Sequence, residues 1–183
     1  MAIQNYIFST WKKVVSSFGY EEYTASILEP AELYRAKSGE EIVNEQTYTF
    51  KDRGDREVTL RPEMTPTVAR MVAHERRNLP LPIRWFSIPN LFRYEKPQRG
   101  RNREFWQLNV DIFGSKSQSS ELEMLQMALD IVLAFNPPKY SFILCLNHRQ
   151  LIEGLMSMVS PDPTMKQGIV RLMDKWQKMS WVD

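Results

Sequence analysis

The chain has 183 residues, of which 43% are hydrophobic and 25% charged, so it is long enough for one globular domain with a substantial core. Its formal net charge of +2 is too small to indicate nucleic-acid binding from composition alone. No apolar run reaches the roughly 18 residues of a membrane span and no signal-peptide pattern opens the chain, so we expect a cytoplasmic protein without membrane contact. The chain has a single cysteine, Cys145, so it cannot form an intrachain disulfide. One cysteine and two histidines in the whole chain do not favour a zinc site.

The first predicted element is an amphipathic helix over residues 3–18. Its apolar side chains recur at helical spacing, and Gly19 follows as a C-cap. An extended segment is expected from 20 to 30, then a helical tendency that gives way to a polar stretch ending at 45. Two short strands, 46–51 and 57–60, are joined by the turn sequence DRGD, which predicts a hairpin.

The second strand of that hairpin leads into a strand-to-helix junction. Polar side chains at this junction include Arg61, Glu63 and Thr65. Pro66 suits the first turn of the following helix, where its missing N–H costs no hydrogen bond. The pattern therefore predicts polar groups gathered at the beginning of a helix.

Two apolar runs, 85–92 and 105–113, flank a polar segment rich in arginine and predict two long strands joined by a cationic loop. Side chains alternate along a strand, so Gln107, Asn109 and Asp111 share one face, as do Arg93 and Glu95 on the first strand. Guanidinium groups bind phosphate oxygens, and carboxylates accept from amino groups. The expected ligand carries a polyphosphate at one end and an amine at the other.

Beyond this hairpin, residues 119–135 predict a helix, 140–146 a buried strand, 150–159 a short helix and 164–181 a second amphipathic helix. The prolines between 161 and 163 indicate a boundary. The predicted fold class is α+β, with a mainly antiparallel sheet flanked by helices.

One stretch resembles a known family. The string FRYEKPQRGRNREFWQLNVDIFG, from Phe92 to Gly114, is similar to motif 2 of class II aminoacyl-tRNA synthetases in the form found in histidyl-tRNA synthetases. The upstream string TLRPEMTPTVARM, from Thr59 to Met71, resembles the amino-acid-binding segment of the same family. The likeness extends from about Ile3 to Asp183. It implies a class II catalytic core.

The resemblance implies an ATP site. Arg93 matches the arginine that holds the α-phosphate and the attacking carboxylate, and Arg101 matches the loop arginine that reaches the γ-phosphate. Glu95 is similar to the glutamate that accepts from the adenine amino group, and Phe105 to the aromatic residue on which adenine stacks. Mg²⁺ is expected with ATP, because three phosphates carry more charge than these arginines neutralise.

The resemblance also implies a histidine site. Glu63, Thr65 and Gln107 match positions that contact the α-ammonium group of the substrate, which has three donors to satisfy. Asp111 falls where the family places an acidic residue facing the imidazole ring. The implied activity is that of a histidine–tRNA ligase, which activates histidine to histidyl-adenylate with ATP and transfers it to tRNA(His), as a homodimer formed through the first helix.

Parts of the family pattern do not occur in this sequence. These are a third motif with a second arginine, and the signature Leu-x-Arg-Gly-x-x-Tyr-Tyr. We therefore expect residues 1–160 to form an incomplete catalytic domain and 161–183 to begin a helical insertion domain, with weak or no activity in this chain alone. Two other functions are considered: a regulatory subunit of ATP phosphoribosyltransferase in histidine biosynthesis, which binds without aminoacylation, and a synthetase-like module that binds uncharged tRNA.

Overall fold

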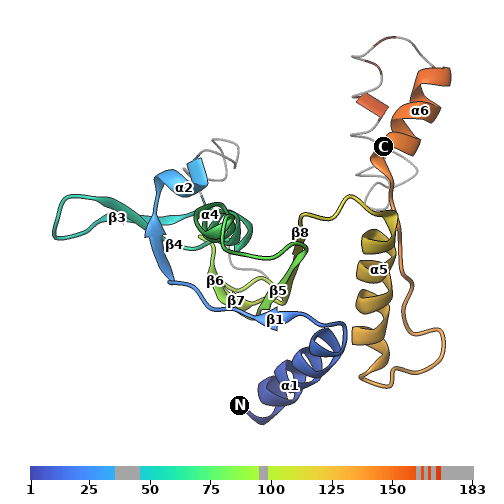
Figure 1. The fold of residues 1–183 in the computed structure, drawn as a ribbon, viewed down its shortest axis with the longest axis horizontal. Coiled ribbons are helices and arrows are strands. Elements are labelled where there is room, and N and C mark those ends of the chain that lie inside the picture. Colours follow the sequence, from blue (N-terminus) through green and yellow to red (C-terminus); the bar gives the residue numbers. More distant parts are fainter. Residues whose placement is uncertain (36–45, 95–98, 160–161, 163–164, 166–167, 170–183) are drawn as a thin grey trace. The chain divides into compact units, whose positions relative to one another are not determined.

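The computed structural model describes residues 1–35, 46–94, 99–159, 162, 165 and 168–169. The chain divides into two compact units, Met1–Pro138 and Lys139–Asp183, each of which is described by itself (Figure 1). The expected domain boundary between 160 and 161 falls on residues outside the described ranges, so it stays a prediction. The expected helix over 164–181 also lies largely outside them.

A three-stranded sheet forms the centre of the first unit (Figure 1). Its strands, in the order β1-β5-β8, are β1 (Glu21–Glu22), β5 (Ile83–Ser87) and β8 (Asn109–Phe113). β1 runs parallel to β5, and β8 runs antiparallel to it. In this register Trp85 pairs with Asp111 and Ser87 pairs with Asn109. The predicted antiparallel pairing of the two long runs is therefore confirmed.

Each of the two long runs is nevertheless interrupted, which the sequence pattern did not predict. β5 is followed by a separate strand, β6 (Asn90–Phe92), and β8 is preceded by β7 (Glu104–Trp106). β6 and β7 pair with each other as a second antiparallel ladder. The interruption includes Pro89, which has no N–H to donate to a ladder, although its carbonyl accepts a 3.1 Å bond from the Gln107 N–H. The hairpin therefore bends between its two ladders.

The second sheet contains the predicted short hairpin. Its strands, in the order β2-β4-β3, are β2 (Leu28–Pro30), β4 (Glu57–Leu60) and β3 (Tyr48–Lys51), all antiparallel. The Asp52 carboxylate closes the turn by accepting from the backbone N–H groups of Gly54 and Arg56. The expectation of a hairpin joined by DRGD is confirmed.

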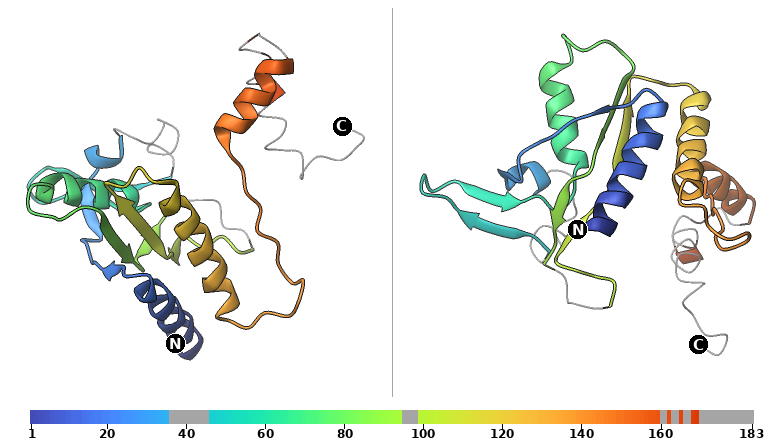
Figure 2. Two further views of the ribbon diagram at one scale, coloured as in Figure 1. Left: turned by 45° about the vertical axis from the view of Figure 1, so that its right-hand side comes forward. Right: turned by 90° about the horizontal axis from the view of Figure 1, so that it is seen from below.

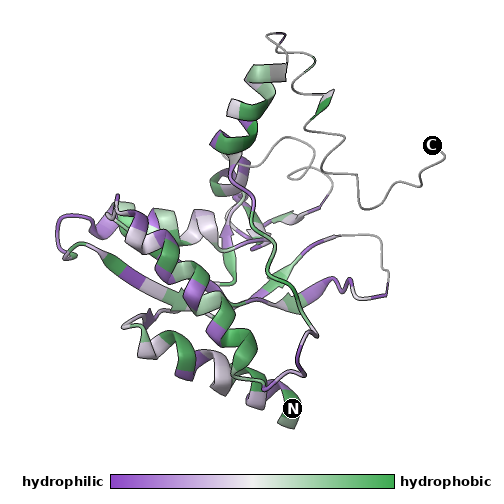
Figure 3. Ribbon diagram, turned by 90° about the vertical axis from the view of Figure 1, so that its right-hand side faces the viewer, coloured by the Kyte–Doolittle hydropathy of each residue, from purple (hydrophilic) through white to green (hydrophobic). Residues whose placement is uncertain are grey.

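The helices of this unit are α1 (Ala2–Ser17), α2 (Glu32–Arg35), α4 (Thr65–Glu75) and α5 (Gln118–Leu133). α1 ends as predicted, with Gly19 at φ +80°, a conformation that favours glycine. α5 begins at Ser117, whose hydroxyl accepts a hydrogen bond from the Ser119 N–H. Hydrophobic and hydrophilic residues alternate along the helices (Figure 3), as expected for helices that bury one side.

These helices cover the two faces of the central sheet (Figure 2). On one face, α1 and α5 pack their apolar side chains on the even-numbered residues of β5 and β8, in a cluster centred on Val15, Tyr20, Phe86 and Met127. On the other face, α4 contributes Val68 to a second cluster with Met64, Tyr23 and Trp85. The fold is α+β, as predicted.

In the second unit the described structure includes α6 (Arg149–Val159), which confirms the helix expected over 150–159. The strand expected over 140–146 is wrong: this segment has no strand pairing with any described residue, and its apolar side chains are exposed, Ile143 by 86%. A strand needs a neighbouring edge for its hydrogen bonds, and β propensity alone does not supply one. None of the helices described is long and apolar enough to cross a membrane.

Candidate active site

Arg93, which directly follows β6, is held by three contacts with neighbouring segments. Its backbone N–H donates to the Arg103 carbonyl at 2.9 Å, and its Nε donates to the Pro62 carbonyl at 3.0 Å. Its guanidinium carbon lies 5.2 Å from the centre of the Phe105 ring, within the range of a cation–π contact. The hydrogen bond uses Nε and does not involve the terminal nitrogens. The arginine is thus oriented before any ligand binds.

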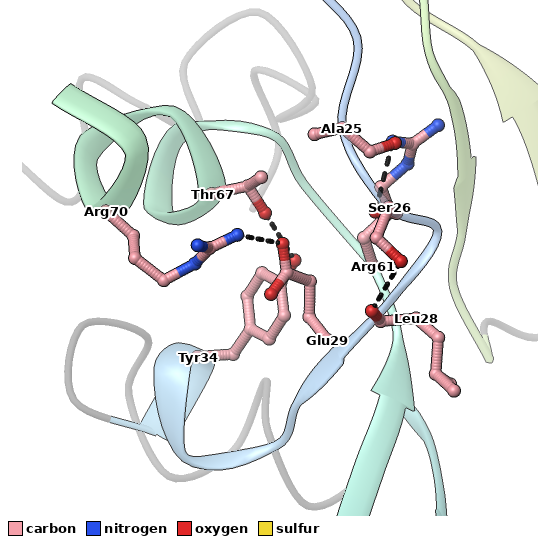
Figure 4. A network of polar contacts seen from close by, with 8 residues as sticks. All are labelled: Ala25, Ser26, Leu28, Glu29, Tyr34, Arg61, Thr67 and Arg70. Carbon is pink, nitrogen blue, oxygen red and sulfur yellow. Dashed lines mark hydrogen bonds and ion pairs between the residues drawn. The ribbon is translucent and has the colours of Figure 1, made fainter. Parts of the chain in front are cut away.

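The junction after β4 is fixed to the hairpin by Arg61. The Phe92 N–H donates to the Arg61 carbonyl at 3.0 Å. Arg61 is 5% exposed, and its side chain donates to the carbonyls of Ala25 and Ser26, which lie beside it in Figure 4. It also donates to the carbonyl and the amide oxygen of Asn90. Burial lowers the pKa of Arg61 from its usual value. A buried cation satisfied by carbonyls ties three segments together beside Arg93.

A second polar network fixes the first turns of α4 (Figure 4). Glu29 is buried and forms a 2.8 Å ion pair with Arg70. Tyr34 and Thr67 share a 3.0 Å hydrogen bond between their hydroxyls, and burial raises the pKa of Tyr34 to about 12. These contacts come from β2 and α2 on one side and from α4 on the other. They hold the beginning of α4, where Thr65 is the first helical residue and Glu63 lies two residues before it.

Polar residues of β8 and of the segment just before it continue the candidate site along the sheet. Gln107 Nε2 donates to Asn109 Oδ1 at 3.3 Å, so the expected proximity of these side chains is confirmed. Asp111 stands on the same face as Asn109, paired with Trp85. Burial raises the pKa of Tyr23 to about 12, and the charge of Asp111 adds to this rise.

Of the eight residues predicted for the site, the structure brings Arg93 and Phe105 into contact and places both beside the junction that carries Glu63. Thr65 and Arg101 are exposed. Glu95 lies outside the described residues. The roles assigned to these residues remain predictions.

The sequence pattern did not single out Tyr23, and it indicated Arg61 only as a polar residue of the junction, not as a buried cation. Tyr23 and Arg61 belong to segments far from the hairpin in sequence, and only the pairing of β1 with β5 and the bonds of Arg61 bring them there. The residues around Tyr23 in the sequence do not indicate that it lies beside the hairpin. Among the described residues, no group of three or more histidine, cysteine, aspartate or glutamate side chains is arranged to hold a metal ion.

Solved structures with the same fold include a histidyl-tRNA synthetase from Nostoc sp. PCC 7120, with a TM-score of 0.78 and 20% identity over 94% of this chain and 40% of that one. Another, from Bacillus halodurans, is named as an ATP phosphoribosyltransferase regulatory subunit/histidyl-tRNA synthetase and has a TM-score of 0.76, with 22% identity over 91% of this chain and 42% of that one. The central sheet and its helices therefore have the fold of these two structures, of which this chain covers about two fifths.

The sequence comparisons are more specific than the fold. A family model described as histidyl-tRNA synthetase matches residues 4–178. A curated histidine–tRNA ligase from Leptospira biflexa is 55% identical over 181 residues, which are 98% of this chain and 41% of that protein. The chain belongs to the histidyl-tRNA synthetase family. It spans about two fifths of the length of the curated relatives it matches.

Proposed function

We propose that this chain binds ATP and histidine in the reaction of a histidine–tRNA ligase, which joins histidine to AMP and then to tRNA(His). The observation that carries the proposal is the fixed guanidinium of Arg93, held by the Pro62 carbonyl and stacked near Phe105. In activation, a carboxylate oxygen of histidine forms a bond to the α-phosphorus of ATP as the bond to pyrophosphate breaks. Both reacting groups are anionic, so a cation fixed between them lowers the barrier without having to reorganise.

Phe105 supplies an apolar surface for adenine, in keeping with its half-buried position beside Arg93. Arg101 binds the γ-phosphate, and Glu95 accepts from the adenine amino group. Mg²⁺ would be held chiefly by the phosphates, as is usual for this ion, because it retains waters and needs few protein ligands.

Glu63, Thr65 and Gln107 receive the α-ammonium group of histidine, and Asp111 accepts a hydrogen bond from the imidazole ring. The bond between Gln107 and Asn109 and the pairing of Asp111 with Trp85 support this assignment, because amide and carboxylate groups then lie on β8 and just before it. A carboxylate opposite a ring N–H gives a charge-assisted bond that apolar amino acids cannot make.

The whole reaction includes steps that this chain would share with the remainder of a full-length ligase. Transfer to tRNA(His), assembly as a homodimer through α1 and a cytoplasmic location are part of the proposal. We expect weak or undetectable activation of histidine by this chain alone, because the family's third motif, with its arginine, does not occur in its sequence. The regulatory-subunit alternative is not favoured, since the curated relatives are named as ligases.

The proposal is tested by calorimetric titration of the chain with a non-hydrolysable histidyl-adenylate analogue, with the prolyl and threonyl analogues as controls. Selective binding of the histidyl analogue is expected. Arg93→Ala should weaken it by about 10- to 100-fold, the range for a charged hydrogen-bonding group. Arg53→Ala, an exposed arginine in the β3–β4 turn, removes the same charge elsewhere and should leave affinity unchanged.

Equal affinity for the three analogues would contradict the assignment of histidine as the substrate. Loss of binding in Arg53→Ala as large as in Arg93→Ala would show that net charge, and not the fixed guanidinium, accounts for the affinity.

A further inference from the structure

Tyr94, the residue directly after Arg93, is half exposed and yet is held by side chains of two other segments. It is 52% exposed. The Arg103 guanidinium carbon lies 4.4 Å from the centre of the Tyr94 ring, within the range of a cation–π contact. The Tyr48 ring lies 5.4 Å from the Tyr94 ring at an interplanar angle of 85°, which is an edge-to-face pair. Tyr94 therefore links the arginine-rich hairpin to β3.

The backbone at Arg93 and Tyr94 is fixed on both sides. The Arg93 N–H donates to the Arg103 carbonyl at 2.9 Å, and the Tyr94 N–H donates to the Gln46 carbonyl at 2.9 Å. The first bond joins the two arms of the arginine-rich hairpin, and the second joins it to the segment just before β3. The peptide between Arg93 and Tyr94 is thus tied to two different neighbours.

One end of the β3–β4 hairpin contacts both residues. β3 and β4 are antiparallel, and Gln46 precedes β3 while Pro62 follows β4, so both lie at the same end of this hairpin. The Pro62 carbonyl accepts from Arg93 Nε at 3.0 Å, and the Gln46 carbonyl accepts from the Tyr94 N–H. The strands of the hairpin extend away from the central sheet (Figure 1). Its base therefore serves as a support for the Arg93 segment.

Two cations meet at this point of the hairpin. The bond from the Arg93 N–H to the Arg103 carbonyl places the two arginines opposite each other. Like charges directly opposite each other in an antiparallel pair repel. The two guanidinium groups are accommodated on different rings, that of Arg93 at 5.2 Å from the Phe105 ring and that of Arg103 at 4.4 Å from the Tyr94 ring. Tyr94 thus gives the second cation a place of its own.

We propose that Tyr94 and Tyr48 are positioning residues for Arg93. The Tyr94 ring retains the Arg103 guanidinium, so that the Arg93 guanidinium stays on Phe105 and Pro62, and Tyr48 fixes the Tyr94 ring to the base of the β3–β4 hairpin. The inference rests on the proposed function, because it explains how the cation of the ATP site is held. A cation that is already in place pays no cost of reorganisation when its anionic ligand binds.

The test uses two ligands that differ in their need for Arg93. One is the non-hydrolysable histidyl-adenylate analogue. The other is histidinol, which has the imidazole ring and ammonium group of histidine but neither carboxylate nor phosphate. In Tyr94→Leu, affinity for the adenylate analogue should fall roughly five- to tenfold, the combined value of one aromatic pair and one cation–π contact. Affinity for histidinol should not change, and Tyr94→Phe should restore the affinity for the analogue.

A double-mutant cycle asks whether Tyr94 acts through Arg93. In the Arg93→Ala background, Tyr94→Leu should change affinity for the adenylate analogue by less than about twofold, because the side chain that Tyr94 positions has been removed. Tyr48→Leu removes only the aromatic pair and should weaken binding of the analogue by roughly two- to fivefold. Calorimetric titration of each variant provides the affinities.

Phe50→Leu is the matched control. Phe50 lies two residues from Tyr48 on β3, hence on the same face, and is 48% exposed. The substitution removes an exposed ring from the same strand and leaves the pair of Tyr48 with Tyr94 in place. Affinity for both ligands should equal that of the unaltered chain.

Three results would overturn the inference while the proposed function stands: no loss of affinity for the adenylate analogue in Tyr94→Leu, an equal loss for the analogue and for histidinol, or a loss of the same size in the Arg93→Ala background. Absence of analogue binding by the unaltered chain would overturn both proposals.

Discussion

The two faces of the central sheet differ in how completely their polar groups are satisfied. On the face covered by α1 and α5, Phe86 and Met127 are buried, and the polar groups Tyr20, Arg84 and Glu123 bond to one another. On the face covered by α4, one side-chain polar atom in each of Tyr23, Ser87 and Asn109 is buried and has no hydrogen-bond partner among the described residues. Adjacent residues of one strand thus differ in their surroundings: the polar groups on one face are paired, and three on the other face are not.

The largest effect is expected where the first face is most tightly packed. Phe86→Ala should lower the free energy of unfolding by about 3–5 kcal/mol, because it removes a fully buried ring and leaves a cavity. Ser87→Ala, the next residue but on the other face, should not lower it, because the substitution removes a buried hydroxyl that has no partner among the described residues. Urea denaturation of both variants measures the contrast. Similar losses in the two would show that both faces contribute equally to stability.

A smaller effect is expected at Asp111, on the face of the sheet that α4 covers. Asp111→Ala should weaken binding of the histidyl-adenylate analogue by about 10- to 100-fold, the worth of a charge-assisted hydrogen bond. Stability should change less than in Phe86→Ala, since Asp111 is only half-buried. Calorimetry with the histidyl and prolyl analogues provides the measurement. Affinity that falls equally for the two analogues would remove Asp111 from the determinants of specificity.

Tyr20 offers a test of the satisfied polar network. Its hydroxyl bonds to the Glu123 carboxylate, so Tyr20→Phe should cost about 1–2 kcal/mol of unfolding free energy. Thermal and urea denaturation would detect this loss. A variant as stable as the parent chain would mean that water replaces the bond without cost and that the two faces are less different than their contacts indicate.

The last prediction concerns the protons of buried tyrosines. Burial raises the pKa of Tyr20, Tyr23 and Tyr34 to about 12 from the ordinary value of 10.0. Between these pH values the unfolded chain loses phenolic protons that the folded chain keeps, so stability is intact below pH 10 and decreases as pH rises toward 12. In Tyr23→Phe the slope of stability against pH over this range should fall by one proton. Urea unfolding at several alkaline pH values would reveal an unchanged slope if Tyr23 titrates normally.

Periodicity in the sequence predicts the elements that bury one side. The spacing of apolar residues in α1 and α5, the glycine after α1 and the DRGD turn all depend on local chemistry, and the structure confirms them. The division of the long hairpin into two ladders and the unpaired segment from 140 to 146 were not predictable in this way. Both depend on which backbone groups find partners, and that is decided by the tertiary fold.

The candidate site was predictable only where its residues form a continuous motif. Arg93, Gln107 and Asp111 lie within one hairpin, so their spacing alone indicates a shared surface. Tyr23 joins them through the parallel pairing of β1 with β5, and Arg61 through its bonds to carbonyls of two other segments. Contacts between residues so distant in sequence leave no periodic pattern.

The exposed run from Phe142 to Leu146 affects how this protein behaves at high concentration. It combines β-forming residues with no charge and no proline, the composition of segments that add to one another as intermolecular strands. Lys139 and His148 lie on either side of it, but no charged residue lies within the run to oppose self-association. We expect light scattering to rise steeply with protein concentration, and to rise far less when Ile143 is replaced by lysine. Preparations for the binding experiments are therefore best kept dilute.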